Sequence, residues 1–314
     1  MSVVPEVAGH GEGVTRIGLV LGAGGVTGEA FHRGVLAALA DIGFDGRTAD
    51  VIVGTSAGSL VAASLRCAGS SSAAASAGAP PDDVVRRRPD LRPWLAAARR
   101  PWTARAGVLA TALVPAGTRT TETFVEPLRR RCGTAWPDHE LLVCATRRRD
   151  GRRVVFGAPG MPETDVASAV AASCAIPGYF RPVTIGGEVY VDGGVHSPTN
   201  ADVLAGHHLD LVVVSSPMSV ERHAIRAKLD LSARLLWHRY VVAERRALER
   251  GGTLVLAVEP GGETLRALGV NALSAARTDT IEDLARETTA ALLARPDTAG
   301  HVALLGGRVA AKPA

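Results

Sequence analysis

One serine stands at the spacing of an enzymatic nucleophile. The segment GTSAG, residues 54 to 58, fits the elbow pattern G-x-S-x-G, in which the serine lies on a sharp turn from a strand into a helix. Gly54 and Gly58 permit the turn, and the hydroxyl of Ser56 is exposed where a helix N-terminus stabilises a negative intermediate. A chain rich in glycine, alanine and serine can also contain such a turn for purely structural reasons. The strand pattern before the segment and the helical pattern after it favour the nucleophile.

A second glycine-rich turn lies earlier in the chain, in the sequence LGAGGVTG at residues 21 to 28. Such a loop directs free backbone N–H groups at one point at the start of a helix, where the helix dipole also favours negative charge. The dinucleotide fingerprint G-x-G-x-x-G requires glycine where Thr27 stands, and the next strand does not end in an acidic residue. The loop therefore predicts a site for a phosphate or a developing oxyanion, and it disfavours a dinucleotide.

A serine nucleophile needs a base, and the sequence offers two kinds. A histidine triad is typical of α/β-hydrolases, but there the elbow follows several strands, whereas here it follows one strand and one helix. The downstream histidines show no supporting pattern; they are His196, His207, His208, His223, His238 and His301. The segment YVDGGV, residues 190 to 195, instead places Asp192 at the end of a strand with two glycines behind it. A carboxylate in a partly apolar pocket can have a raised pKa and act as the base itself.

The elements that would position these residues follow from hydrophobic periodicity. Two consecutive strand, glycine-turn and helix units at the start of the chain predict a parallel sheet with helices on its faces. Gly186-Gly187 between two short strands predicts a hairpin. The expected strands are Arg16–Leu21, Val51–Val53, Leu141–Thr146, Val154–Phe156, Val183–Ile185, Glu188–Val191, Leu209–Ser215 and Thr253–Val258. The expected helices are Gly28–Ala40, Ala57–Leu65, Glu221–Arg250 and Thr280–Leu293.

Taken in order, the glycine-rich loop, the elbow and the DGG element resemble the patatin-like phospholipase family. A fourth segment, AASCAIPGYFRPV at residues 171 to 183, resembles the small residues, proline and aromatic that precede the aspartate in that family. The resemblance spans residues 16 to about 200. It implies an α/β fold of the patatin type: a three-layer α/β/α sandwich with a mainly parallel central sheet and a helical insertion.

The resemblance also implies a reaction and the residues that perform it. The function would be hydrolysis of lipid acyl esters through an acyl-enzyme intermediate, with Ser56 as nucleophile, Asp192 as proton acceptor and no histidine. The backbone N–H groups of Gly24 and Gly25 would form the oxyanion hole. No cofactor and no metal is expected. The glycines that support the motifs are Gly22, Gly28, Gly54, Gly58, Gly193 and Gly194.

Two positions depart from the family pattern and keep alternatives open. Thr27 stands where a basic residue is common, and Ala23 stands where a glycine is common. These departures bear on phospholipid cleavage more than on hydrolase chemistry. The alternatives are an acyltransferase that uses the same dyad, or a catalytically weak binding or regulatory protein with the same fold. Ser173 and Cys174 are interpreted as packing residues of a helix, and His196 as a loop residue.

Composition limits the class of partner and the compartment. The formal net charge of +4 is too small to indicate a nucleic-acid binder, and the arginine clusters are interpreted as solvated faces. Cys67, Cys132, Cys144 and Cys174 show neither a metal-binding pair nor a disulfide framework, so we expect reduced thiols and a cytoplasmic location. No signal peptide is expected, and no apolar run reaches the roughly 18 residues of a membrane span.

The chain is expected to form a single hydrolase domain over residues 14 to 314, after a disordered N-terminus at 1 to 13. A small-residue stretch at 68 to 81 predicts a flexible linker, and residues 82 to 131 predict a helical insertion or cap. Within that insertion, residues 86 to 107 combine arginines with two tryptophans, a composition typical of segments that contact an anionic membrane surface. A solvated cap is the favoured interpretation, and peripheral contact with the inner membrane face is the alternative.

Overall fold

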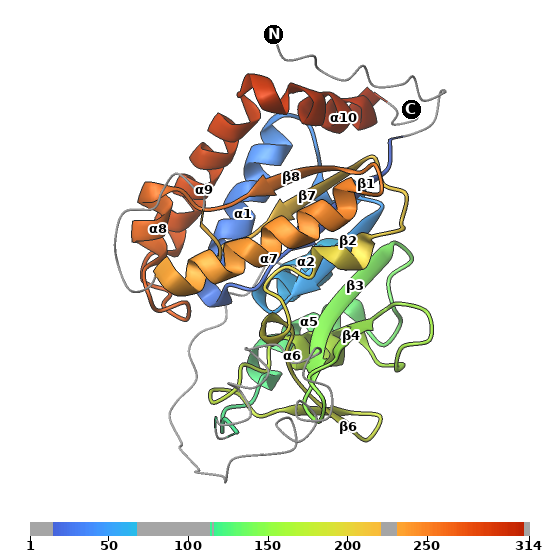
Figure 1. Ribbon diagram of the computed structural model, residues 1–314. Coiled ribbons are helices and arrows are strands. Elements are labelled where there is room, and N and C mark those ends of the chain that lie inside the picture. Colours follow the sequence, from blue (N-terminus) through green and yellow to red (C-terminus); the bar gives the residue numbers. More distant parts are fainter. Residues whose placement is uncertain (1–14, 68–113, 115, 221–230, 311–314) are drawn as a thin grey trace.

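Short apolar runs form the strands of an eight-stranded sheet in the computed structural model, which describes residues 15–67, 114, 116–220 and 231–310 (Figure 1). The strands are β1 (Ile17–Leu21), β2 (Val51–Thr55), β3 (Glu140–Arg147), β4 (Arg153–Phe156), β5 (Val183–Ile185), β6 (Glu188–Asp192), β7 (Leu211–Ser215) and β8 (Leu254–Val258). Their hydrogen-bonded order is β5-β6-β3-β2-β1-β7-β8, and β4 also pairs with β3. Every residue of β1, β2 and β7 is buried, as expected for strands that are covered on both faces.

Parallel pairing dominates the centre of the sheet. The pairs β3 with β2, β2 with β1, β1 with β7 and β7 with β8 are all parallel. The strands β4, β5 and β6 pair in antiparallel fashion at one end of the sheet. The mainly parallel sheet that the sequence predicted is therefore confirmed.

The two edges of β3 are used by three strands. Along β3, β2 pairs with Glu140 to Cys144 and β6 pairs with Ala145 to Arg147. The strand β4 pairs with Val143 to Thr146, which overlaps both of these stretches. Because a strand has only two edges, β4 occupies one of them, and β2 and β6 follow one another along the other. They run toward each other, and their last residues, Thr55 and Asp192, lie opposite successive residues of β3.

Helices cover both faces of the sheet and give the expected three layers. The helices are α1 (Gly25–Asp41), α2 (Ala57–Arg66), α5 (Glu122–Cys132), α6 (Val166–Ser173), α7 (Leu231–Glu249), α8 (Gly262–Leu268), α9 (Thr278–Leu293) and α10 (Ala299–Ala310). One face packs against α1, α2, α5, α6 and α9, with Phe31 and Ile281 among the fully buried side chains. The other face packs against α7 and the short helix η4 (Ala201–Leu204), through Leu204 and Leu248 (Figure 1).

Most of the predicted helices and strands begin and end within a few residues of the positions expected from the sequence. The hairpin between β5 and β6 has positive φ at both Gly186 (57°) and Gly187 (79°), as a two-residue turn of this type requires. The first helix begins three residues earlier than expected, at Gly25. The long helix expected from residue 221 is described from Leu231 onward. The sequence does not predict α10, because the last helical pattern identified in it ends at Leu293.

The insertion is only partly described. The N-terminus at 1 to 13, the linker at 68 to 81 and the arginine- and tryptophan-rich stretch at 86 to 107 lie outside the described residues. The end of the insertion is helical, as predicted, and forms α5. It packs against α2 and α6 beside the carboxyl ends of β2 and β6.

The expectation of four reduced thiols was wrong for two of them. Cys67, just after α2, forms a disulfide with Cys132, the last residue of α5, and their Cα atoms are 5.2 Å apart. Spacing in the sequence could not reveal this pair, because 65 residues separate its members and only the packing of α5 beside α2 brings them together. Cys144 and Cys174 are free and buried. Since disulfides persist in oxidising compartments, this bond removes the main support for a cytoplasmic location.

The disulfide closes a loop that contains the linker and the whole insertion, so it should stabilise the fold by restricting the unfolded chain. For a separation of 65 residues we expect replacement of both cysteines by serine to lower the free energy of unfolding by about 4 kcal/mol. Denaturant unfolding with and without a thiol reductant measures this change. The wild type should lose the same amount in reductant, whereas the Cys67→Ser/Cys132→Ser variant should be indifferent to it. Equal stability of both proteins under oxidising conditions would contradict the pairing.

Candidate active site

Ser56 lies in the tight turn that joins β2 to α2. Its backbone has φ 54° and ψ −127°, a left-handed conformation that is rare for a residue with a side chain. The neighbouring glycines are required by close contacts. A Cβ on Gly58 would lie 2.0 Å from the carbonyl oxygen of Leu21, and a Cβ on Gly54 would lie 2.4 Å from the Cα of Ser59. The sharp turn from strand to helix that the sequence predicted at Ser56 is therefore present.

The structure brings Ser56 and Asp192 into direct contact. The hydroxyl of Ser56 donates a hydrogen bond of 2.6 Å to Oδ2 of Asp192, across 136 residues of sequence. The backbone N–H of Gly194 donates to the other oxygen, Oδ1, at 2.7 Å. This contact follows from the shared edge of β3, because β2 and β6 end there facing one another. Gly193 is also required, since a Cβ on it would lie 2.2 Å from the carbonyl oxygen of Cys144.

Burial changes the acidity of this carboxyl group. Asp192 is 5% exposed, and removal from water raises its pKa from 3.8 to about 6. The hydrogen bonds from Ser56 and Gly194 act in the opposite direction, because they stabilise the ionised form. At neutral pH the group is therefore ionised, but it is far more basic than an ordinary aspartate. A carboxylate of this kind is suited to accept a proton from a hydroxyl.

Ser173 supports the turn that carries Ser56, a contact that the sequence did not reveal. The backbone N–H of Ser56 donates to Oγ of Ser173 at 2.8 Å, and the hydroxyl of Ser173 donates to the carbonyl oxygen of Cys144 at 2.6 Å. Ser173 ends α6 and is fully buried. It links the strained turn to β3 at the point where β2 and β6 meet. The prediction that it packs in a helix was correct, but the small-residue pattern gave no signal of the link.

The glycine-rich loop has the predicted position beside Ser56. Gly22 and Ala23 donate their N–H groups to the carbonyls of Ser215 and Pro198, at 3.0 and 2.7 Å, and so tie the loop to the sheet. Gly25 begins α1 with φ 60° and lines the cavity in front of Ser56. Its N–H has no acceptor within the helix, because the first turn of a helix lacks one. Gly24, the residue before Gly25, packs against Pro217. A Cβ on Gly24 would lie 2.6 Å from the Cγ of Pro217.

The side chain of Thr27 does not line the cavity. It therefore does not take the place of the basic side chain that the sequence resemblance leads one to expect at position 27. It is buried, and its hydroxyl donates to the carbonyl oxygens of Gly24 at 3.3 Å and Ala272 at 3.4 Å. Its N–H also donates to Ala272 at 3.1 Å. These bonds hold the segment around residue 272 against the glycine-rich loop. The C-terminal third of the chain, to which the sequence assigned little, therefore contributes to the site.

His32 is a second supporting residue that the sequence did not reveal. It is fully buried on α1, with Nε2 2.7 Å from the carbonyl oxygen of Gly22 and Nδ1 2.7 Å from Oγ of Ser215. Burial lowers its pKa to about 4, so the ring is neutral at physiological pH. Because a carbonyl only accepts, Nε2 carries the proton and Nδ1 accepts from the hydroxyl of Ser215. His32 thus fixes the start of the glycine-rich loop rather than acting as a base.

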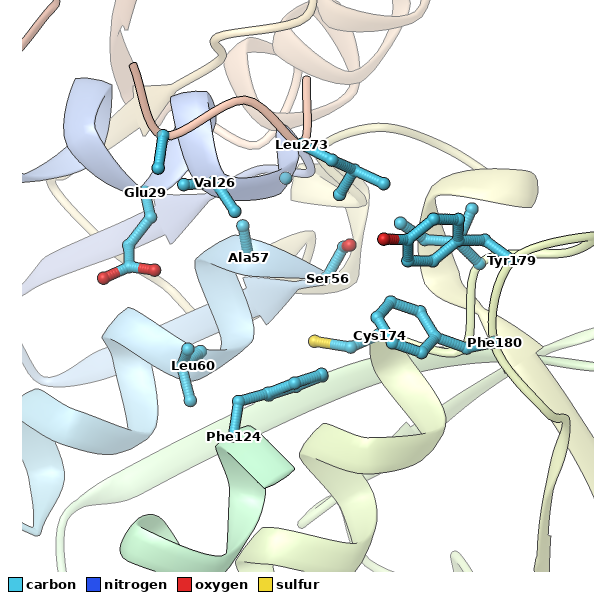
Figure 2. Close-up of a pocket in the computed structure, with 13 residues that line it drawn as sticks. Val26, Glu29, Ser56, Ala57, Leu60, Phe124, Cys174, Tyr179, Phe180 and Leu273 are labelled. Atoms are coloured by element: carbon cyan, nitrogen blue, oxygen red, sulfur yellow. The ribbon is translucent and has the colours of Figure 1, made fainter. Parts of the chain in front are cut away.

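A mostly apolar cavity of about 120 Å³ opens in front of Ser56. Figure 2 shows Ser56 at its border, with side chains of α1, α2, α5 and the Tyr179–Phe180 segment around the opening. Its lining residues are Gly25, Val26, Glu29, Ser56, Ala57, Leu60, Phe124, Cys174, Ile176, Tyr179, Phe180, Leu273 and Ala275. Glu29 is the acidic residue in this mostly apolar lining. Its carboxylate pairs with Arg33 at 2.8 Å, and burial raises the pKa of Glu29. The rest of the lining suits a hydrocarbon chain.

No histidine is among the described residues that line the cavity. His196 lies near the carbonyl of Gly151, His207 near Glu140, and His238 pairs with Glu259 at 2.8 Å. His223 lies outside the described residues. The described ranges also contain no group of three or more His, Cys, Asp or Glu side chains that could hold a metal ion. The titratable side chain that accepts a hydrogen bond from the hydroxyl of Ser56 is that of Asp192.

Comparison with known proteins supports the resemblance seen in the sequence. A family model described as patatin-like phospholipase matches residues 19–205, which include the glycine-rich loop, the elbow and the DGG element. Two solved structures are similar to the chain. VipD from Legionella pneumophila has 12% sequence identity and a TM-score of 0.39, over 89% of this chain and 66% of that one. The type III effector protein ExoU has 16% identity and a TM-score of 0.36, over 93% of this chain and 54% of that one. The chain thus spans about two thirds and about half of their lengths.

The raised pKa of Asp192 predicts a cost in stability at neutral pH. Between pH 4 and 6 the folded state holds a proton that the unfolded state has released, so the free energy of unfolding falls as the pH rises through this window. Asp192→Asn does not titrate and should be more stable than the wild type at pH 8, by about 3 kcal/mol at most. Denaturant unfolding at pH 4 and pH 8 measures the difference.

Asp150 provides a control of opposite sign. Burial acts to raise its pKa, but the hydrogen bonds from Arg147 and Arg152, together with the charges of Arg147 and Arg149, lower it by more, so the net shift is downward. Asp150→Asn should therefore be less stable than the wild type at pH 8. A variant Asp192→Asn with the wild-type pH dependence of unfolding would show that Asp192 is not the buried basic carboxyl described above.

Proposed function

The chain belongs to the patatin-like phospholipase family, a family of lipid hydrolases, and we propose that it cleaves acyl esters with Ser56 as nucleophile and Asp192 as base. The observation that carries this proposal is the 2.6 Å hydrogen bond between their side chains, at the border of an apolar cavity. The dyad needs no third member, because Gly194 already orients the carboxylate from the other side. Ser56 and Asp192 are the residues on which the proposal depends.

Acylation begins with the proton that Ser56 already shares with Asp192. As Oγ attacks the carbonyl carbon of the ester, Oδ2 of Asp192 takes the hydroxyl proton, which the short distance permits without rearrangement. A tetrahedral intermediate forms with negative charge on the former carbonyl oxygen. When it collapses, the protonated Asp192 gives its proton to the leaving alcohol, and the acyl group stays on Ser56. The neutral carboxylic acid formed on the way is favoured by the same burial that raises the pKa of Asp192.

Deacylation repeats these steps with water in place of serine. Asp192, ionised again, takes a proton from a water molecule that attacks the acyl carbon, and it then returns the proton to Oγ of Ser56. The carboxylic acid product leaves with the acyl chain. An alcohol that replaces water in this step would receive the acyl group, so the same dyad could catalyse acyl transfer. Nothing in the lining of the cavity favours a particular alcohol, and hydrolysis is the function we propose.

The oxyanion needs donors that are in place before the reaction. We assign this role to the backbone N–H groups of Gly24 and Gly25, at the start of α1 and beside the cavity. The helix dipole of α1 adds positive potential at the same point. The loop is held by its bonds to Ser215 and Pro198 and by the buried ring of His32, so the donors do not need to reorganise. Removal of one such donor typically costs about 3 kcal/mol of transition-state stabilisation.

The acyl chain is proposed to occupy the apolar cavity. Leu60 lies one helical turn beyond Ser56 on α2, and Phe124 of α5 faces the same space (Figure 2). An alkyl chain attached to Ser56 would contact these side chains and leave water, a transfer that contributes about 0.8 kcal/mol for each methylene group. This favours esters of apolar acids, and lipids are the substrate class that combines such an acyl chain with an ester.

A lipid substrate raises the question of contact with a membrane. No helix in the described part of the chain has both the length and the apolar character needed to span one. We propose that any contact is peripheral and that it is made by the stretch at 86 to 107, which lies outside the described residues. The insertion that contains this stretch ends in α5, which lines the cavity through Phe124. A bound lipid would therefore meet the insertion and the catalytic pair together.

Replacement of either member of the dyad tests the proposed chemistry. Ser56→Ala should reduce ester hydrolysis to background, and Asp192→Asn should lower kcat/KM by about 100- to 10,000-fold, because it removes the general base. The rate of the wild type should rise with pH through about 6, where Asp192 ionises, and should level off above it. Ser64→Ala, on the same helix, is the matched control. Activity that survives Ser56→Ala would exclude the dyad, and activity kept in Asp192→Asn would point to another base.

A bulky side chain in the cavity tests where the acyl group binds. Leu60→Trp should raise KM for esters of long-chain acids and leave acetyl esters little changed, because only the longer chains reach this residue. Hydrolysis of a series of p-nitrophenyl esters, from acetate to palmitate, measures the dependence on chain length. Leu236→Trp, at a residue of α7 that is 44% exposed, is the control. An equal effect of Leu60→Trp on all chain lengths would place the acyl group elsewhere.

A further inference from the structure

A buried asparagine contacts both of the residues that flank the proposed dyad. Nδ2 of Asn200 donates to Oγ1 of Thr55, the residue before Ser56, at 3.1 Å. The same nitrogen lies 3.5 Å from the carbonyl oxygen of Gly193, the residue after Asp192. It also donates to the carbonyl oxygen of Ser197 at 2.7 Å. The amide of Asn200 therefore lies next to the point where the ends of β2 and β6 meet.

The backbone conformation and the hydrogen-bond partners at this position together favour asparagine. Asn200 has φ 55° and ψ 28° and is fully buried. Asparagine is one of the few residues with a side chain that adopts this left-handed conformation readily. Its amide also supplies two N–H donors to a site lined by oxygen atoms, which an aspartate of the same shape cannot do. Glycine would adopt the backbone conformation but lacks the amide. Aspartate has the shape of asparagine but lacks the N–H donors.

A carboxylate on the opposite layer holds the segment that carries Asn200. Glu244, on α7, is buried and accepts hydrogen bonds from the hydroxyls of Ser197 and Thr199, both at 2.5 Å. It also accepts from the backbone N–H of Ala201 at 2.8 Å. These three donors lie on both sides of Asn200 in the sequence. Because α7 packs on the sheet face opposite to the cavity, the carboxylate fixes this segment from behind without approaching the substrate.

Three further contacts belong to this cluster. NH1 of Arg153 donates to Oδ1 of Asn200 at 3.3 Å, and the same guanidinium pairs with Asp202. The hydroxyl of Thr55 donates to the carbonyl oxygen of Thr199 at 3.4 Å. The side-chain amide of Asn200 thus has a partner on its oxygen as well as on its nitrogen. Its orientation is set by these partners, and a rotation would break contacts on both sides.

We propose that Asn200 is a positioning residue for the Ser56–Asp192 pair and that Glu244 holds it in place. This proposal rests on the function proposed above. Asn200 touches neither the cavity nor the reacting atoms, so it acts through Thr55 and Gly193. It links the end of β2 to the end of β6 and so maintains the 2.6 Å separation of the dyad. A misplacement of about 1 Å in such a pair can lower the rate by about 100-fold.

Two variants of Asn200 separate the backbone from the amide. Asn200→Gly keeps the left-handed conformation and removes the amide, and Asn200→Asp keeps the shape and replaces the donors with a carboxylate. In the full chain, with p-nitrophenyl butyrate as substrate, we expect kcat to fall by about 10- to 100-fold and KM to stay within about twofold. The acidic limb of the pH profile should move above its wild-type position, because Asp192 loses the hydrogen bond from Ser56 that lowers its pKa.

A matched control removes a buried hydrogen bond elsewhere. Thr289 on α9 is fully buried, and its hydroxyl donates to the carbonyl oxygen of Ala285 at 2.7 Å. Thr289→Val should lower the thermal unfolding midpoint and leave kcat per folded molecule and the acidic limb unchanged. Circular dichroism of each variant gives the folded fraction by which kcat is corrected. Asn200 variants that lose stability but keep the wild-type kcat and acidic limb would overturn the proposal.

Thr55→Val keeps the proposal testable if the Asn200 variants do not fold. Valine is nearly isosteric with threonine, but it lacks the hydroxyl that accepts the hydrogen bond from the Asn200 amide. Thr55→Val should therefore lower kcat and move the acidic limb of the pH profile upward, as the Asn200 variants do. A wild-type kcat and acidic limb in Thr55→Val would overturn the positioning role. Failure of the dyad itself has a different signature, because Ser56→Ala would then retain hydrolysis whatever residue stands at position 200.

Discussion

One edge of β3 carries two strands end to end, and the proposed chemistry depends on this arrangement. The parallel strand β2 and the antiparallel strand β6 run toward one another along it, and their carboxyl ends meet. The turn after β2 carries Ser56, and the last residue of β6 is Asp192. Two groups far apart in the chain therefore lie within one hydrogen bond because both are placed by the ladder of a single strand. A sheet backbone holds such a distance more rigidly than loops would.

The residues around this junction make it rigid from several sides. Ser173 connects the backbone of Ser56 to β3, and Asn200 connects the residues next to Ser56 and Asp192 on the opposite side. His32 holds the glycine-rich loop from within α1. All three are buried polar side chains whose hydrogen bonds are satisfied. An apolar residue in the place of any of them would leave its present hydrogen-bond partners without a bond. The left-handed backbone of Ser56 is maintained against its intrinsic preference by this surrounding structure.

The cavity beside this junction is built by segments from the rest of the chain. Phe124 comes from the end of the insertion, Tyr179 from the loop before β5, and Leu273 from the C-terminal third. The disulfide between Cys67 and Cys132 ties the end of α5 to the end of α2, so two walls of the cavity are covalently joined at one end. The same burial that makes the cavity apolar raises the pKa of Asp192 to about 6. The proposed binding of an acyl chain and the basicity of the carboxylate would thus have one physical cause.

The sequence alone determined the features that arise from local patterns. Hydrophobic periodicity and glycine turns identified the strands, the hairpin at Gly186-Gly187 and most helices, and three short motifs identified Ser56 and Asp192 as candidates. It did not reveal the disulfide, α10, or the supporting roles of His32, Ser173 and Asn200. Those roles are contacts between residues far apart in the chain, such as the 145 residues between Asn200 and Thr55. No local pattern encodes such a contact, because it exists only when strand pairing and helix packing bring distant segments together. Residue type at short spacing is readable from the sequence, whereas the distance between two side chains is decided by the tertiary structure.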